Sequence, residues 1–156
     1  MLRITGGRLR GRMIQVPPTG NQHETRPSKA RLRQALFNSL QAVVPGARVL
    51  DLFSGSGSLA FEALSRGAAF AVAVETAKPA LSVIQANART LEVQQEFRAV
   101  SRSVEQCWDE VLRDGAFDVV LADPPYADDW ERKLLEAAPW DRLLEPEGVF
   151  VLEWGV

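Results

Sequence analysis

Short apolar runs alternate along the chain with longer stretches in which apolar residues recur every three or four positions. The runs suit strands buried on both faces of a parallel sheet, and they occupy 49–53, 71–75, 97–100, 117–122 and 148–152. The longer stretches have the helical period, and they occupy 27–44, 58–66, 79–91, 104–112 and 130–138. Because strands and helices alternate, we predict a doubly wound, Rossmann-like α/β sheet, mostly parallel.

The first 26 residues do not fit this alternation. Ile4 and the segment 13–16 predict two short strands around a glycine-rich turn, and 17–26, with its two prolines, predicts a loop. We therefore divide the chain into a small basic N-terminal arm or hairpin, residues 1–26, and a main domain, residues 27–156.

A glycine turn follows the first long strand and precedes a helix. Asp51 lies near the end of the strand, and Gly55 and Gly57 follow it. Such a turn lets a ligand approach free backbone N–H groups at the carboxyl edge of the sheet. Two glycines without a third do not make the dinucleotide pattern, and the carboxylate of Asp51 would repel a pyrophosphate. S-adenosylmethionine, which carries an amino group and a sulfonium, fits this site better.

The next strand ends in an acid, Glu75, 24 residues after Asp51. This spacing matches the acidic residue, about 20 residues on, that binds ribose hydroxyls in nucleoside-cofactor folds. We expect Glu75 to hold the ribose of the cofactor.

Asp123-Pro124-Pro125-Tyr126 follows the fourth strand directly. The prolines donate no N–H, so the loop offers acceptors, namely the Asp123 carboxylate and the Pro124 carbonyl, beside the flat face of Tyr126. Acceptors of this kind can grip the hydrogens of a planar exocyclic amine and help to localise its lone pair. We expect methyl transfer to such an amine with no metal.

Charge is distributed unevenly. Residues 1–33 carry eight Lys and Arg against Glu24 alone, a net charge of +7, whereas the whole chain carries −2. A basic arm on an acidic body predicts a polyanionic partner, most simply RNA. The predicted RNA-binding residues are Arg3, Arg8, Arg10, Arg12, Arg26, Lys29 and Arg33. The last three recur at helical spacing, so we expect a phosphate-binding stripe, with Leu32, Leu36 and Leu40 packed inward.

Composition limits the other classes of function. Cys107 is the single cysteine, so neither an internal disulfide nor a thiolate metal cluster is expected, and we read it as a buried apolar residue. No apolar run approaches the roughly 18 residues of a membrane span. The start of the chain lacks the apolar region of a secretion signal. We expect a cytoplasmic protein, with no membrane partner and a monomeric state.

These motifs resemble those of a known family. Asp51, Gly55, Gly57, Glu75 and Asp123-Pro-Pro-Tyr126 are similar to class I S-adenosylmethionine-dependent amino-methyltransferases. The opening Arg3-Ile-Thr-Gly-Gly-Arg-Leu-Arg-Gly-Arg12, with Arg26-Pro-Ser and Arg31-Leu-Arg-Gln-Ala-Leu-Phe-Asn38, resembles the RsmD family. That family methylates N2 of a guanine in small-subunit (16S) ribosomal RNA in bacteria, as naked RNA or as an assembling subunit.

The resemblance implies roles residue by residue. Asp123, Pro124, Pro125 and Tyr126 would hold the guanine amine. The cofactor would contact Asp51, Phe53, Ser54, Gly55, Gly57, Glu75, Ser103 and Val104, with Phe37 and Asn38 closing over it. The family has Thr-Thr-Asp where this chain has Ser28-Lys29-Ala30, and it continues into two further strands that form a C-terminal hairpin. The fifth strand is therefore expected at the sheet edge, as a result of truncation or with a partner covering it.

Two other functions stay open from the residues. One is the same chemistry on another amine, either adenine N6 in DNA or RNA or a protein glutamine, although those families favour Asn in place of Asp123 and lack the arginine-rich opening. The other is a catalytically silent RNA-binding module. Measured binding of S-adenosylmethionine would separate an enzyme from such a module.

Overall fold

The computed structural model describes residues 1–18, 27–125 and 128–153. Within them, five parallel strands form the central sheet in the order β5-β4-β3-β6-β7. These strands are β3 (Arg48–Leu52), β4 (Phe70–Val74), β5 (Phe97–Val100), β6 (Phe117–Ala122) and β7 (Leu144–Leu152). The chain runs outward from β3 to β5 and then returns to β6 on the other side of β3. The strand order therefore reverses between β3 and β6, which is where open α/β sheets bind ligands.

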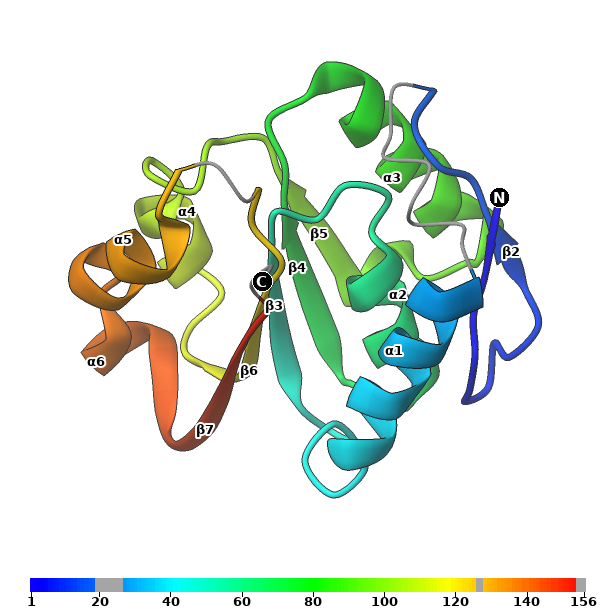
Figure 1. Ribbon diagram of the computed structural model, residues 1–156, viewed down its shortest axis with the longest axis horizontal. Coiled ribbons are helices and arrows are strands. Elements are labelled where there is room, and N and C mark those ends of the chain that lie inside the picture. The colour runs from blue at the N-terminus through cyan, green and yellow to red at the C-terminus, as the bar shows by residue number, and fades with distance from the viewer. Residues whose placement is uncertain (19–26, 126–127, 154–156) are drawn as a thin grey trace.

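Helices cover both faces of the sheet, as the alternating pattern predicts (Figure 1). One face carries α1 (Pro27–Ser39), α2 (Ser58–Ser65) and α3 (Lys78–Thr90), and the other carries α4 (Trp108–Leu112), α5 (Trp130–Ala137) and α6 (Trp140–Leu143). A one-turn 3₁₀ helix, η2 (Gln94–Glu96), leads into β5. The doubly wound, parallel fold is thus confirmed.

Successive side chains of β3 enter two separate hydrophobic clusters. Val49 packs with α1, α2 and α3, whereas Leu50 and Leu52 pack with α4, α5 and α6. All three are fully buried. A strand that alternates between two buried faces has no polar side, which explains why its sequence is a nearly continuous apolar run.

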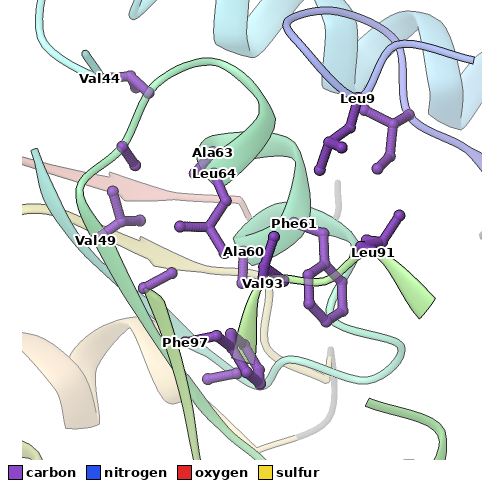
Figure 2. Close-up of a cluster of buried hydrophobic side chains, with 14 of the residues drawn as sticks. Leu9, Val44, Val49, Ala60, Phe61, Ala63, Leu64, Leu91, Val93 and Phe97 are labelled. Atoms are coloured by element: carbon purple, nitrogen blue, oxygen red, sulfur yellow. The ribbon is translucent and has the colours of Figure 1, made fainter. Parts of the chain in front are cut away.

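The N-terminal segment forms a short hairpin that packs on the face of the sheet that carries α1, α2 and α3. Strands β1 (Leu2–Arg3) and β2 (Met13–Ile14) pair antiparallel. Leu9, in the turn between them, joins the cluster around α2, and Figure 2 shows it near Phe61 and Leu91. Phe61 also stacks against Phe97, with ring centroids 5.0 Å apart. The hairpin therefore shares its hydrophobic cluster with the main body, and the division of the chain at residue 26 stays a prediction.

A fully buried carboxylate fixes the hairpin to the helices. Glu62 of α2 is 0 % exposed and accepts hydrogen bonds from the backbone N–H of Thr5 at 3.0 Å and of Gly6 at 3.1 Å. Its oxygens also accept from the guanidinium groups of Arg33 in α1, at 3.3 Å, and Arg66, at 2.8 Å. The negative charge is therefore compensated by two cations and satisfied by backbone donors, as a buried charge requires.

The glycines of the opening motif permit this close approach. The backbone N–H of Arg8 donates to the Ser65 carbonyl at 2.8 Å, and Gly7 lies directly against that carbonyl with φ +83°. A Cβ at Gly7 would stand 1.9 Å from the Ser65 oxygen. Only glycine fits here, so this part of the motif serves to dock the hairpin on the end of α2.

The face of α1 that packs inward differs from the prediction. Leu32 is 51 % exposed, so its predicted inward packing is wrong, whereas Leu40 is buried as expected. Arg33 is only 8 % exposed because its guanidinium pairs with Glu62 and donates to the Arg3 carbonyl at 2.8 Å. The structure therefore does not place Arg33 on an exposed phosphate-binding stripe.

Several element bounds also differ, and α1, for example, ends at Ser39 rather than at 44. α4 begins at Trp108 rather than at 104, because the residues before it form a turn. In this turn the Gln106 N–H donates a hydrogen bond to the Ser103 carbonyl. The short helix α6 was not predicted. β7 begins at Leu144 rather than at 148, since Leu144 pairs with Phe117 before the register shifts. β7 lies at the edge of the sheet, as expected.

Candidate functional site

A cavity of about 840 Å³ opens at the carboxyl ends of the parallel strands. Its wall is built by the ends of β4 and β7, by the segments that follow β3, β4, β5, β6 and β7, and by one side of α1 from Lys29 to Leu36. The predicted catalytic and cofactor-binding residues that line it are Phe53, Ser54, Glu75, Ser103, Val104, Asp123, Pro124 and Pro125. Topology therefore brings together residues that are up to 72 positions apart in the sequence, from Phe53 to Pro125.

The turn between β3 and α2 has a left-handed backbone at three positions. Phe53, Gly55 and Gly57 have φ values of 59°, 59° and 85°. A Cβ at Gly57 would lie 2.5 Å from the ring of Phe61, so glycine is required there. Phe53 is a non-glycine residue in this region, and its ring packs edge to face on Trp130 at 4.8 Å. The turn thus directs an aromatic side chain to the cavity wall.

Asp51 lies beneath this turn. It is 1 % exposed, and its Oδ2 accepts the hydroxyl hydrogen of Ser54 at 2.7 Å. Ser54 lines the cavity, whereas Asp51, Gly55 and Gly57 are not among the lining residues. Asp51 therefore contacts the side of the turn that faces away from the cavity, and the turn lies between Asp51 and the cavity.

Glu75 connects the turn to the end of β4. Its Oε1 accepts from the Gly55 N–H, and its Oε2 accepts from the N–H groups of Thr76 and Ala77, each at 2.9 Å. A carboxylate has about four lone-pair positions, so these three bonds leave acceptor capacity toward the cavity. Glu75 thus links the end of β4 to the glycine turn.

The Asp123-Pro124-Pro125 segment forms the opposite wall, directly after β6. Burial raises the pKa of Asp123 above its ordinary value, and the negative charge of Glu153 raises it further, whereas Lys29 lowers it. Asp123 as a whole residue is exposed, while the cavity wall shields part of its carboxyl group from solvent. Tyr126, predicted to stack on the substrate, lies outside the described residues.

The two α1 residues predicted to close over the cofactor lie elsewhere. Phe37 is buried in the core with the Arg66 guanidinium 5.6 Å from its ring centre, and the Asn38 side chain accepts from Arg66 at 3.0 Å. Neither lines the cavity. Lys29, Leu32 and Arg33, from the preceding turns of α1, line it instead.

The arginines of the N-terminal arm differ in their surroundings. Arg3 and Arg10 are exposed. Arg8 pairs with Glu96 at 2.8 Å, and Arg12 donates to the Thr90 carbonyl at 2.9 Å. Both contacts are at the surface. The ion pair of Arg8 with Glu96 therefore contributes little to stability. Arg26 lies outside the described residues.

Sequence reasoning missed several residues of the wall, among them Arg102, Trp130 and Glu153. Arg102 and Glu153 each follow a strand end by one or two residues, and carboxyl ends of parallel strands meet at one edge. That position was a usable signal. Trp130 was predicted only as the start of a helix, and its place in the cavity depends on how α5 packs.

Three further predictions concern the single cysteine, metal-binding clusters and membrane-spanning helices. Cys107 is buried, as predicted, and burial raises its pKa to about 12, so its thiol stays protonated. No cluster of three His, Cys, Asp or Glu side chains suited to a metal occurs among the described residues. In the same part of the chain, no helix has the length and apolar character that a membrane span requires.

Comparison with known proteins adds a family to this geometry. A family model described as conserved hypothetical protein 95 matches residues 2–155. The Escherichia coli K12 protein named ribosomal RNA small subunit methyltransferase D is 35 % identical over 147 residues, which are 94 % of this chain and 68 % of that protein.

Solved structures agree. A hypothetical protein of Thermus thermophilus is 35 % identical, with a TM-score of 0.82 over 99 % of this chain and 86 % of that one. A provisionally named methyltransferase of Escherichia coli is 31 % identical, with a TM-score of 0.80 over 99 % and 82 % of the two chains. The fold is that of the class I S-adenosylmethionine-dependent methyltransferases. Since the family model spans nearly every residue, the chain belongs to the conserved hypothetical protein 95 family, which is the RsmD family.

Proposed function

We propose that this protein transfers a methyl group from S-adenosylmethionine to the exocyclic N2 amine of a guanine in small-subunit ribosomal RNA. One observation carries the proposal: Glu75 and the Asp123-Pro124-Pro125 segment face one cavity at the switch point of the sheet. A nucleoside cofactor held at the first and an amine held at the second would lie within the same cavity. The name of the Escherichia coli relative supports ribosomal RNA as the substrate.

The cavity suits this cofactor. Phe53, Val74 and Val104 provide apolar walls for a nucleoside, and Glu75 offers an acceptor to ribose hydroxyls. The β3–α2 turn lies beside the carboxylates of Asp51 and Glu75, which favours a cationic ligand over a phosphate. S-adenosylmethionine, when bound, supplies an electrophilic methyl group on a positively charged sulfur.

We assign the Asp123 carboxylate the role of acting on the amine. It would accept an N2 hydrogen together with the carbonyl of Pro124, and it would take the proton that the nitrogen loses as its lone pair forms the new bond. The guanine must be unpaired or flipped out to enter, at a cost of a few kcal/mol. We assign Tyr126 the role of stacking on the base, which is worth about 1–3 kcal/mol.

The test is to incubate the protein with bacterial small-subunit RNA and with assembling subunits that lack the modification, using methyl-labelled S-adenosylmethionine. The product is digested and its nucleosides are identified by mass spectrometry. We expect N2-methylguanosine. Labelled N6-methyladenosine would contradict the proposal, and a protein that binds RNA but neither binds the cofactor nor transfers label would be the silent module.

We expect Glu75→Ala to weaken S-adenosylmethionine binding by about 1–3 kcal/mol, the range for a lost hydrogen bond to a charged group. The substitution removes the ribose acceptor and also the partner of the Gly55 N–H. Calorimetric titration of the cofactor measures the loss. Glu75→Gln keeps an acceptor oxygen and should lose less. Affinity equal to wild type in Glu75→Ala would remove this residue from the cofactor site.

We expect Arg10→Ala to weaken RNA binding and to reduce the slope of log affinity against log salt by about one unit, because one phosphate contact is lost. Arg10 is exposed on the hairpin. Cofactor affinity should not change. Arg142→Ala, an exposed site in α6 on the opposite face of the sheet, is the matched control. RNA binding that is independent of salt in the wild-type protein would rule out the phosphate-binding role of the arm.

A further inference from the structure

A second acid stands beside Asp123 in the cavity. Leu152 of β7 is paired with Ala122 of β6, and the Glu153 N–H continues the ladder by donating to the Ala122 carbonyl at 3.0 Å. Asp123 and Glu153 are therefore neighbours, each one residue beyond its strand, and both line the cavity. The negative charge of Glu153 acts on Asp123 and raises the pKa of its carboxyl group.

The carboxylate of Glu153 can accept a hydrogen bond from a ligand in the cavity. Its side chain is 40 % exposed, and its Oε1 lies 3.5 Å from the Nζ of Lys29, which comes from α1 and lines the same cavity. The pair thus offers two acceptor groups side by side, with a cation behind the second.

This arrangement matches one edge of guanine. Its Watson–Crick edge presents two adjacent donors, N1–H and the N2 amine, whereas adenine presents an acceptor at N1. A flipped base is read through hydrogen bonds to that edge. Two adjacent carboxylates can accept hydrogen bonds from two adjacent N–H groups. A carboxylate that faced the adenine N1 would place its lone pair against the lone pair of that nitrogen, and the two would repel each other.

We propose that Glu153 determines base specificity by accepting the N1–H of the guanine whose N2 amine faces Asp123. This rests on the proposed function above and deepens it. Lys29 is then a positioning residue, because its ammonium group holds the Glu153 carboxylate toward the cavity. The contrary view makes Lys29–Glu153 an ordinary ion pair at the rim, which would add little to stability or specificity.

The probe that separates these views is 2-aminopurine. It keeps the N2 amine but has an acceptor at N1, so it removes the proposed partner of Glu153 and leaves that of Asp123. The methylated position is first located by mass spectrometry of the product fragments. Two RNA fragments are then made, with guanine or 2-aminopurine at that position, and kcat/KM is measured for each.

We expect the wild-type protein to prefer guanine by roughly 10- to 100-fold, the factor for a hydrogen bond to a charged group. Glu153→Gln should lose activity on guanine by a similar factor, and its preference should fall toward one, because an amide can donate to the N1 of 2-aminopurine. Glu147→Gln, an exposed acid of β7 that does not line the cavity, should keep the wild-type preference. Cofactor affinity and melting temperature, measured in parallel, show whether each variant is folded.

The outcomes separate the two proposals. Methylation of guanine with equal activity on 2-aminopurine in the wild-type protein would overturn the role of Glu153 and leave the proposed function standing. A Glu153→Gln variant that keeps the wild-type preference would do the same. Absence of guanine methylation by the wild-type protein would overturn both.

Discussion

Replacement of Asp123 by alanine should lower kcat by about 100- to 10,000-fold, the range for a positioned proton acceptor. The carboxylate is expected to bind the amine more tightly as the nitrogen becomes positive, so its loss falls on the chemical step rather than on substrate binding. KM for RNA and the affinity for S-adenosylmethionine should change little. Steady-state transfer of labelled methyl groups to small-subunit RNA measures both constants.

The asparagine variant sharpens this test. Asp123→Asn keeps an acceptor oxygen without the charge, so it should retain more activity than Asp123→Ala. Because burial and Glu153 raise the pKa of Asp123, the wild-type rate should fall as pH drops through a value above the ordinary aspartate range. This acidic limb should flatten in the asparagine variant.

Asp141→Ala, an exposed acid in α6 away from the cavity, is the control for the removal of a negative charge. It should turn over at the wild-type rate. If both variants at position 123 also do so, the loop after β6 is structural and the proposed active site is lost.

Removal of the buried carboxylate of Glu62 should destabilise the fold by about 3–5 kcal/mol, the cost of breaking a buried ion pair from one side. In Glu62→Ala, Arg33 remains 8 % exposed without its carboxylate, and the N–H groups of Thr5 and Gly6 lose their acceptor. Urea unfolding followed by circular dichroism measures the free energy of unfolding.

Two further variants interpret the result. Glu62→Gln keeps the size and an acceptor oxygen, so it should cost less than alanine. Glu105→Ala, an exposed acid, should change the free energy of unfolding by no more than about 0.5 kcal/mol, as surface substitutions usually do. A loss in Glu62→Ala as small as that in Glu105→Ala would show that the hairpin and α1 are held by apolar packing alone.

The sequence predicts the sheet well for a physical reason. Strands β3, β4 and β6 are buried on both faces, so burial leaves short apolar runs that alternate with helical patterns along the chain. Glu75 and Asp123 could be predicted as site residues because each directly follows such a run. The same reasoning applied to β7 would have identified Glu153.

The orientation of α1 could not be predicted in this way. Periodicity places Arg33 on the outside unless a buried acid is known to face it, and that acid, Glu62, is 29 residues away on another helix. Leu32 in turn lies at a half-open cavity wall rather than in the core. The positions of Arg33 and Leu32 both depend on residues from distant segments of the chain. Such residues leave no local signal in the sequence of α1.

The docking of the hairpin on α2 also fixes an order of events during synthesis. The bonds from Thr5 and Gly6 to Glu62 join residues 57 and 56 positions apart. Closing so long a loop costs chain entropy before any contact is gained, and the ribosome releases the first residues well before α2 exists. The N-terminal hairpin can form its own local bonds early, but it cannot dock until the β3–α2 unit has left the exit tunnel.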